Sequence, residues 1–162
     1  MKQISSVLFV CMGNICRSPS AEAMFRAKAN VAGLEIEIDS AGTIAYHQGN
    51  APDRRSIAAG VKRGLNFDGM RARQVEQTDF TYFDLILAAD KQNLQDLKRI
   101  CPMEHQHKLA LILDFCDFQS HEIVYTEVPD PYYGAGDGFE LVLDLLENSS
   151  SHLLQRIQRG LL

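Results

Sequence analysis

A thiol and a guanidinium lie close together near the start of the chain, in the stretch CMGNICRSP at residues 11–19. Cys11 and Arg17 are separated by five residues, Met12, Gly13, Asn14, Ile15 and Cys16. Arginine presents a planar fork that holds two oxygens of a phosphate at once. Gly13 tolerates the unusual dihedral angles of a tight anion-binding turn, and Asn14 tolerates the left-handed conformation. Together with the placement of the stretch on a strand-to-helix turn, these residue types indicate a loop that binds an oxyanion beside a sulfur nucleophile.

This loop lies between an apolar run and a predicted helix. Ser18-Pro19 is typical of a helix start, with serine as N-cap and proline at the first helical position. Backbone N–H groups at a helix N-terminus, together with the helix dipole, favour anions and the thiolate form of cysteine. A thiolate beside an oxyanion cradle is a nucleophile aimed at phosphorus. The GxxxxGK[ST] pattern of nucleotide-binding loops is absent from the sequence.

The remaining cysteines and histidines do not form a metal-binding pattern. Cys16, Cys101 and Cys116 are spaced unlike zinc ligands, and the sequence contains no CxxC pair. We expect free thiols, as in a reducing compartment. His105 and His107 lie in a polar segment and are expected to be solvated. The sequence therefore predicts chemistry without a metal or cofactor.

Hydrophobic patterning predicts alternating strands and helices. The expected strands are 4–10, 34–39, 82–88 and 108–113, and the expected helices are 18–32, 53–63, 78–82, 90–100 and 139–158. Asp137 and Glu140 have the spacing of a capping box for the last helix. A long polar loop, 114–136, precedes that helix.

Alternation of this kind predicts an α/β fold with a parallel sheet covered on both faces, in three layers. We expect a doubly wound four-stranded sheet in the order 2-1-3-4, formed by a single domain at residues 1–162. In that order the connection reverses beside the first strand, and ligands bind at the carboxyl end of such a strand. Cys11 lies at that end.

Composition excludes several classes of function. The chain has 162 residues, 46% of them apolar, and a net charge of −5. The acidic balance argues against nucleic-acid or membrane-surface binding. No apolar stretch approaches the ~20 residues that cross a bilayer. Residues 1–10 make a poor signal peptide, so we expect a cytoplasmic protein.

The stretch CMGNICRSPSAEAMF resembles the signature CxGNxCRSPxAEA of the low-molecular-weight protein tyrosine phosphatases. The resemblance continues in order through DSAGT at 39–43, GNAPD at 49–53, ARQ at 72–74, FDLILAAD at 83–90 and DPYYG at 130–134. The fold of that family is the four-stranded sheet predicted above. The resemblance implies hydrolysis of phosphotyrosine monoesters without a metal.

It also implies roles for individual residues. Cys11 corresponds to the nucleophile and Arg17 to the group that binds the phosphate oxygens. Asp130 corresponds to the general acid, which protonates the leaving phenolate and then activates water. Ser18 corresponds to a hydroxyl that donates to the Cys11 thiolate, and we favour this role over capping alone.

Further residues match the rim and the supports of the family's site. Tyr132 and Tyr133 correspond to one aromatic wall of the cleft, and Tyr46 and His47 to the opposite rim. An aromatic wall suits a flat phenyl ring. The rim formed by Tyr46 and His47 varies within the family and sets substrate preference. Asn14 and Ser40 match residues that brace the loop by hydrogen bonds, and Asp90 matches a further aspartate whose alternative role is helix capping.

Met70 and Cys16 concern the support of the loop and the protection of its nucleophile. Many animal members have a histidine near Met70, and methionine donates no hydrogen bond, so either the bracing network is simpler here or another group substitutes. The resemblance also implies a reversible disulfide between Cys16 and Cys11 under peroxide, which protects the nucleophile. The alternative for Cys16 is a small residue packed behind the loop.

Three other functions differ in the residues that they require. Thioredoxin-coupled arsenate reductases share the fold but need two further neighbouring cysteines, which the segment 85–99 lacks. Protein-arginine phosphatases tend to have threonine where Ile15 stands, and the apolar side chain of Ile15 favours an aryl ring. A non-catalytic phosphate-binding or redox module is disfavoured because Cys11, Arg17 and Asp130 are all present. The expected partner is a phosphotyrosine protein, with a tyrosine kinase as a further candidate, and the expected state is a monomer or weak homodimer.

Overall fold

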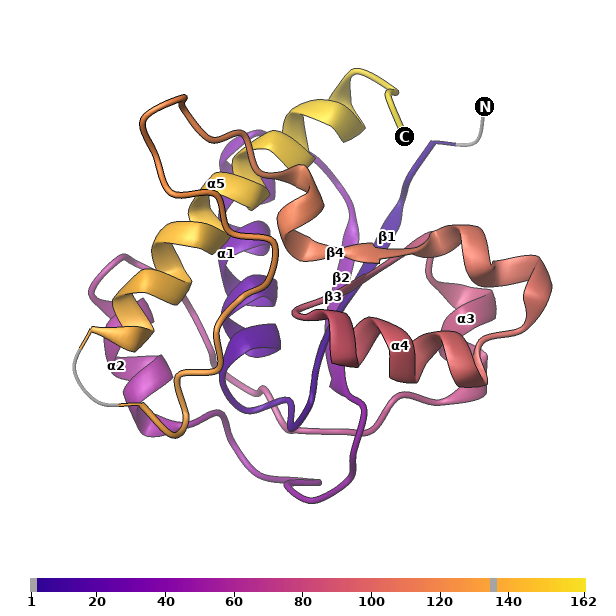
Figure 1. Ribbon diagram of the computed structural model, residues 1–162, viewed down its shortest axis with the longest axis horizontal. Helices are drawn as coiled ribbons and strands as arrows, with labels where there is room; N and C mark the ends of the chain where they lie inside the picture. Colours follow the sequence, from indigo (N-terminus) through magenta and orange to yellow (C-terminus); the bar gives the residue numbers. More distant parts are fainter. Residues whose placement is uncertain (1–2, 135–136) are drawn as a thin grey trace.

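A four-stranded parallel sheet in the order β2-β1-β3-β4 forms the centre of the molecule (Figure 1). The computed structural model describes residues 3–134 and 137–162. The strands are β1 (Ser6–Cys11), β2 (Glu37–Gly42), β3 (Leu85–Ala88) and β4 (Leu109–Leu111). The α/β class, the strand order and the parallel pairing predicted from the sequence are confirmed.

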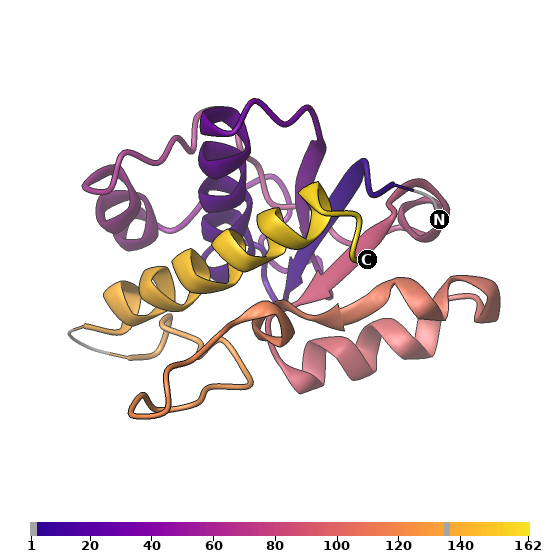
Figure 2. The same cartoon turned by 90° about the horizontal axis from the view of Figure 1, so that it is seen from above.

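Helices cover both faces of the sheet (Figures 1 and 2). One face carries α1 (Arg17–Val31) and α5 (Gly138–Gln158), which pack against each other, with α2 (Arg54–Val61) beside them. The other face carries α3 (Gln77–Tyr82) and α4 (Lys91–Ile100). Two short 3₁₀ helices, η1 (Met103–Lys108) and η2 (Ile112–Phe115), flank β4. No helix in the described part of the chain is both long and apolar enough to cross a membrane.

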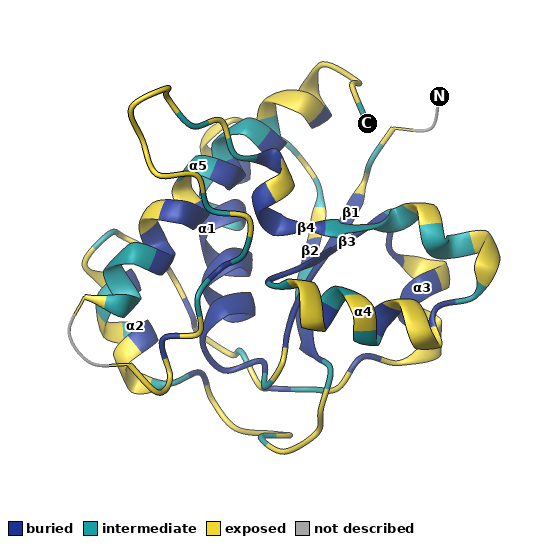
Figure 3. Ribbon diagram, in the orientation of Figure 1, coloured by how far each residue is buried: buried dark blue, intermediate teal, exposed yellow. Residues whose placement is uncertain are grey.

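The two largest clusters of the core are separated by the sheet, and β1 contributes to both. Every residue of β1 is buried, as the dark blue central strand in Figure 3 shows. Val7 and Phe9 face the cluster under α1 and α5, whereas Leu8 and Val10 face the cluster under α3 and α4. Alternate side chains of a strand point to opposite faces, so a strand covered on both faces is apolar throughout. This explains why residues 7–10, between Ser6 and Cys11, are all apolar.

Two predicted strands are shorter than expected. The segment 108–113 forms a strand only at 109–111, because the Asp114 carboxylate accepts the Leu111 N–H at 3.0 Å and turns the chain into η2. Ile112 and Leu113 then reach the core beneath α5. The segment 82–88 forms a strand only from Leu85, since α3 extends to Tyr82. Most of the apolar residues of the two segments are buried, Ile112 and Leu113 in a helical turn, but Tyr82 is exposed.

Two predicted helix caps are wrong. Helix α1 begins at Arg17 with Cys16 at the N-cap position, so Ser18 lies inside the first turn. No side-chain hydrogen bond from Asp137 caps α5, and the Glu140 carboxylate instead lies 3.4 Å from Arg63. In contrast, Asp53 and Asp90 do cap α2 and α4 through their side chains. A polar residue near a predicted helix start therefore does not by itself establish a side-chain cap.

Replacing Phe25 tests the packing between α1 and the sheet. Phe25 is fully buried, and its ring meets that of Phe9 edge to face with centroids 5.8 Å apart. We expect Phe25→Ala to lower the free energy of unfolding by about 3–5 kcal/mol, measured by urea denaturation. The control Val31→Ala removes an exposed side chain from the same helix and should change stability by less than about 0.5 kcal/mol. Equal losses in both variants would contradict the assigned core.

Candidate active site

The loop 12–16 joins the carboxyl end of β1 to the first turn of α1. Its carbonyl groups are held from outside: the Met12 carbonyl accepts the Ile44 N–H at 3.1 Å, and the Ile15 carbonyl accepts the Asp53 N–H at 2.7 Å. The Thr43 N–H likewise binds the Cys11 carbonyl at 2.9 Å. Gly42 is needed here, because a Cβ at that position would lie 2.6 Å from the Met12 carbonyl oxygen. Segments following β2 therefore determine the shape of the loop.

The Cys11 sulfur lies within reach of two donors. It accepts the Asn14 backbone N–H at 3.3 Å, and the Ser18 hydroxyl oxygen lies 3.0 Å away. The Ser18 oxygen also accepts an N–H from the Asn14 amide at 2.8 Å. The Ser18 proton thus points either to Cys11 or to the more distant Ala41 carbonyl at 3.4 Å. The geometry allows Ser18 to donate to the sulfur, as the resemblance implied.

Asn14 adopts the left-handed conformation, with φ = 58°, and no other non-glycine residue in the described ranges has positive φ. This confirms the expectation for Asn14. Gly13, by contrast, does not have a positive φ. Gly13 is instead covered by His47, and a Cβ on it would lie 2.9 Å from the His47 ring. The glycine provides space, whereas the asparagine provides the turn.

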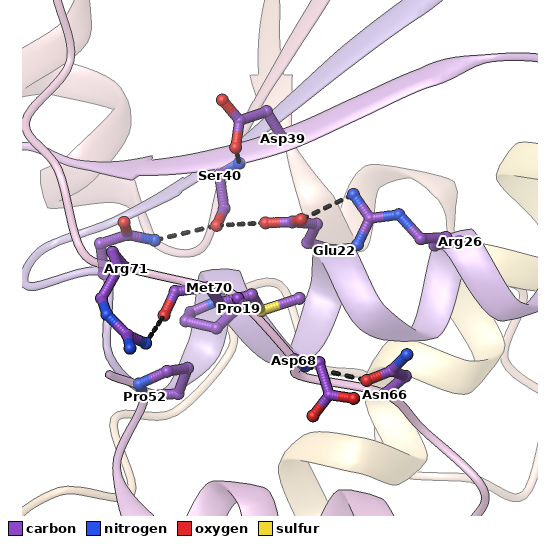
Figure 4. A pocket seen from close by; sticks show the side chains of 12 residues that line it. Pro19, Glu22, Arg26, Asp39, Ser40, Pro52, Asn66, Asp68, Met70 and Arg71 are labelled. Atoms are coloured by element: carbon purple, nitrogen blue, oxygen red, sulfur yellow. Dashed lines mark hydrogen bonds and ion pairs between the residues drawn. The ribbon is translucent and has the colours of Figure 1, made fainter. Parts of the chain in front are cut away.

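The bracing network continues behind the loop to a carboxylate that sequence reasoning did not single out. The Asn14 amide donates to the Ser40 hydroxyl at 3.0 Å, and Ser40 donates to Glu22 at 2.7 Å. Glu22 also binds Arg26 at 2.7 Å (Figure 4). The only signal in the sequence was an acidic residue on the alanine-rich, buried face of α1.

These residues border a hollow of about 490 Å³, on which Met70 also lies (Figure 4). The direct hydrogen bond from Ser40 to Glu22 shows how the bracing network forms with methionine at position 70. Ser40 has an acceptor of its own, so the network needs no donor at position 70.

Arg17 is buried and joined to three groups around the loop. Its Nη1 donates to Asp90 at 2.7 Å and to the Val128 carbonyl at 3.0 Å, and its Nη2 lies 3.8 Å from Asp130. Burial by itself lowers the pKa of Arg17, but the neighbouring Cys11, Asp90 and Asp130 raise it, and the net pKa is above its ordinary value. The guanidinium is therefore a permanent positive charge. Asp90 also accepts the Asn93 N–H at 2.7 Å, so it both caps α4 and holds Arg17.

Asp130 is brought to the loop by the segment that follows η2. Val128 anchors this segment, because its N–H donates to the Ala89 carbonyl at 2.8 Å while its carbonyl accepts from Arg17. The Asp130 carboxylate accepts the Tyr132 N–H at 3.0 Å, which turns the chain at the proline-flanked aspartate. About a third of the Asp130 side chain is exposed, so this carboxyl group faces the pocket opening.

Aromatic rings surround the pocket opening. The rings of His47 and Tyr132 lie 6.2 Å apart, so the two predicted walls meet over the loop. Tyr133 stacks edge to face on Tyr132 at 4.9 Å, and Tyr46 does the same on His47 at 4.8 Å. Tyr46 and Tyr133 are largely exposed.

The structure brings most of the predicted site residues to one small pocket of about 40 Å³. Its lining comprises Cys11, Met12, Gly13, Ile15, Cys16, Arg17, His47, Asp130, Tyr132 and Tyr133. Asn14, Ser18 and Ser40 do not line it but brace the loop from behind, and Tyr46 lies outside it against His47. The predicted residues therefore separate into a lining and a support.

All four cysteines are free thiols. Burial raises the pKa of Cys16 to about 12, so this thiol is protonated at neutral pH. Burial likewise raises the pKa of Cys101, and that of Cys116 to about 12. Within residues 3–134 and 137–162, no group of three or more His, Cys, Asp or Glu side chains is arranged to hold a metal ion.

Comparison with known proteins gives a consistent result over nearly the whole chain. Residues 6–161 match the family model described as low molecular weight phosphotyrosine protein phosphatase. A low molecular weight protein-tyrosine-phosphatase of Bacillus subtilis is 41% identical over 156 residues, which cover 95% of this chain and 96% of the relative.

Solved structures agree. The crystal structure of the protein tyrosine phosphatase from Entamoeba histolytica with Hepes in the active site superposes with a TM-score of 0.92. It is 41% identical, and the match covers 98% of this chain and 99% of that one. The crystal structure of YfkJ from Bacillus subtilis superposes with a TM-score of 0.88 at 40% identity, covering 98% of each chain.

Replacing Asn14 tests the bracing network. Asn14→Ala removes the amide that serves Ser18 and Ser40 and places a Cβ-bearing residue without a compensating amide in the left-handed region. We expect a loss of about 2–4 kcal/mol in the free energy of unfolding, because buried hydroxyls lose a partner and the backbone is strained. The exposed asparagine Asn66 is the control, and Asn66→Ala should cost less than about 1 kcal/mol. A near-neutral Asn14→Ala would show that the network carries no stability.

Proposed function

Because this chain belongs to the low molecular weight phosphotyrosine protein phosphatase family, we propose that its protein-tyrosine-phosphatase activity proceeds through a phosphocysteine on Cys11. The substrates of such an enzyme are phosphoproteins. Arg17 binds the phosphate oxygens, Asp130 serves as general acid and base, and Ser18 stabilises the sulfur anion. No metal or cofactor takes part.

One observation carries this proposal: Cys11, Arg17 and Asp130 line the same small pocket. A nucleophile, a permanent cation and a carboxyl group within one pocket are the parts that phosphate-ester hydrolysis needs. They come from β1, the first turn of α1 and the segment before α5, so their meeting is a property of the fold. The N-terminus of α1 adds its dipole to the charge of Arg17.

In the first step, the Cys11 sulfur attacks phosphorus and the bond from phosphorus to the phenolic oxygen breaks. Asp130 gives its proton to that oxygen, so tyrosine leaves as a neutral phenol. Arg17 and the backbone N–H groups of the loop face the charge on the phosphoryl oxygens. Arg17 is held in place for this by Asp90 and the Val128 carbonyl.

In the second step, the ionised Asp130 takes a proton from water as the water oxygen attacks phosphorus. The bond from sulfur to phosphorus breaks, its electron pair returns to Cys11, and inorganic phosphate is released. A hydrogen bond from Ser18 to sulfur, for which the 3.0 Å separation is suitable, makes the thiolate a better leaving group.

The aromatic rim supports a preference for phosphotyrosine. His47 and Tyr132 stand 6.2 Å apart above the loop and offer ring faces to a phenyl group. Ile15 adds an apolar side chain to the lining. The Hepes molecule in the active site of the Entamoeba relative is a sulfonate, which is chemically similar to a phosphate monoester, and this supports an oxyanion in the equivalent loop here.

Cys16 is proposed as a guard against oxidation. Peroxide would oxidise Cys11 to a sulfenic acid, and attack by Cys16 would then form a disulfide and release water. The raised pKa of Cys16 keeps it protonated at neutral pH, so it does not compete as a nucleophile with substrate. We further place the enzyme in the cytoplasm, as a monomer or weak homodimer, with a tyrosine kinase as the source of its substrates.

Replacing the nucleophile separates binding from catalysis. We expect Cys11→Ser to abolish hydrolysis of p-nitrophenyl phosphate, because a serine hydroxyl in this pocket has no base to ionise it. Vanadate should still bind, since the loop and Arg17 are unchanged; calorimetry measures its affinity. A Cys11→Ser variant with full activity would disprove the phosphocysteine.

Replacing Asp130 tests the general acid. We expect Asp130→Ala to lower kcat for phosphotyrosine by about 10²–10³, within the range for a positioned acid. Esters whose leaving group is already stable as an anion need no proton and should lose much less. Steady-state kinetics over a series of aryl phosphates measures the difference. Equal losses for all leaving groups would assign Asp130 a different role.

A peptide panel tests the substrate class. Matched peptides with phosphotyrosine, phosphoserine or phosphoarginine are compared for phosphate release by the purified protein under reducing conditions. We expect turnover of phosphotyrosine to exceed that of the other two by at least about tenfold, because the ring alone fills the aromatic rim. Faster turnover of phosphoarginine would overturn the proposed specificity.

A further inference from the structure

We propose that Arg55, held by Asp53, is a positioning residue that links the nucleophile loop to the segment carrying Asp130. This inference rests on the proposed function, because it assigns Arg55 an effect on the proton transfer by Asp130. Arg55 does not line the pocket, and we assign it a role through Tyr132 and Asp130.

One end of the link is attached to the nucleophile loop. The Asp53 N–H donates to the Ile15 carbonyl at 2.7 Å, which is the shortest of the backbone bonds that hold the loop from outside. Asp53 is also the N-cap of α2, and its carboxylate accepts the Arg55 N–H at 2.8 Å. The carboxylate is therefore fixed relative to Ile15 by its own backbone.

The Arg55 side chain extends from this carboxylate. Its Nε and Nη2 donate to the two Asp53 oxygens at 3.0 Å and 2.9 Å, a two-bond contact that a planar guanidinium makes and an ammonium does not. Hydrogen bonding from Arg55 lowers the pKa of Asp53, which agrees with a stable ion pair. The Asp53 side chain is only 12% exposed, whereas that of Arg55 is about half exposed, so the carboxylate is the more enclosed member of the pair.

The other end of the link holds the segment that bears the acid. Arg55 Nη2 donates to the Tyr132 carbonyl at 3.2 Å, and the guanidinium lies over the Tyr132 ring at 5.4 Å from its centroid. It also lies over the Phe139 ring at 4.8 Å, at the start of α5. Tyr132 in turn donates its backbone N–H to the Asp130 carboxylate at 3.0 Å.

These contacts form a continuous path from the nucleophile loop to the acid: Ile15, Asp53, Arg55, Tyr132 and Asp130. Before Asp130, the segment is anchored at Val128, whose N–H donates to the Ala89 carbonyl and whose carbonyl accepts from Arg17. Arg55 holds the chain on the other side of Asp130. Without it, the turn at 130–133 loses this attachment, and the carboxyl group samples positions away from the leaving oxygen.

The variants Arg55→Ala and Arg55→Lys test this role, with Arg54→Ala as the matched control from the same helical turn. Arg54 is exposed, so Arg54→Ala removes an equal charge without touching the link. We expect both Arg55 variants to lower kcat for phosphotyrosine about tenfold, a fraction of what a positioned acid contributes. Aryl phosphates with good leaving groups should lose less than about twofold, and inhibition by inorganic phosphate should be unchanged.

A double-mutant cycle with Asp130→Ala gives the decisive readout. If Arg55 acts through Asp130, then Arg55→Ala causes no further loss of kcat for phosphotyrosine in the Asp130→Ala background. A merely structural effect would be additive and would weaken phosphate inhibition as well. Equal losses over all leaving groups, additivity in the cycle, or full activity of Arg55→Lys would each overturn the inference. A wild-type enzyme that fails to hydrolyse phosphotyrosine would instead overturn the proposed function, before any variant is compared.

Discussion

The left-handed turn at Asn14 is the constraint on which the site depends. A single buried asparagine adopts φ = 58° and forms hydrogen bonds to Cys11, Ser18, Ser40 and the Arg73 backbone N–H. These partners belong to β1, α1, β2 and the segment 72–74, which are brought together only in the folded chain. Because an unpaired buried amide is costly, these hydrogen bonds stabilise this conformation of the loop around the sulfur.

Charge in the site is arranged around one buried guanidinium. Arg17 lies between Asp90, which also caps α4, and Asp130, which lies at the pocket opening. The first carboxylate is engaged by the protein, whereas the second is about a third exposed. Two aspartates with different surroundings can therefore take different roles, one holding the cation and one exchanging protons with the ester oxygen and with water.

Sequence patterning predicted the topology well and the ends of the elements less well. The apolar run before Cys11 lies in a strand buried on both faces, which leaves little alternative to the central position. The segments 82–88 and 108–113 have the same apolar character, yet each forms a shorter strand than predicted, and Ile112 and Leu113 are buried in a helical turn. Apolar runs record burial, and the hydrogen bond of a single residue such as Asp114 decides between strand and 3₁₀ helix.

The sequence by itself predicted the fold class from its hydrophobic pattern, and its resemblance to a known family pointed to most of the residues that line the pocket. Only the tertiary structure decided what supports them. Glu22 braces Ser40 from an alanine-rich helix face, and Arg55 reaches the Tyr132 carbonyl across 77 residues of chain. Such partners have no fixed spacing in the sequence, since packing of the helices on the sheet alone brings them within hydrogen-bonding distance.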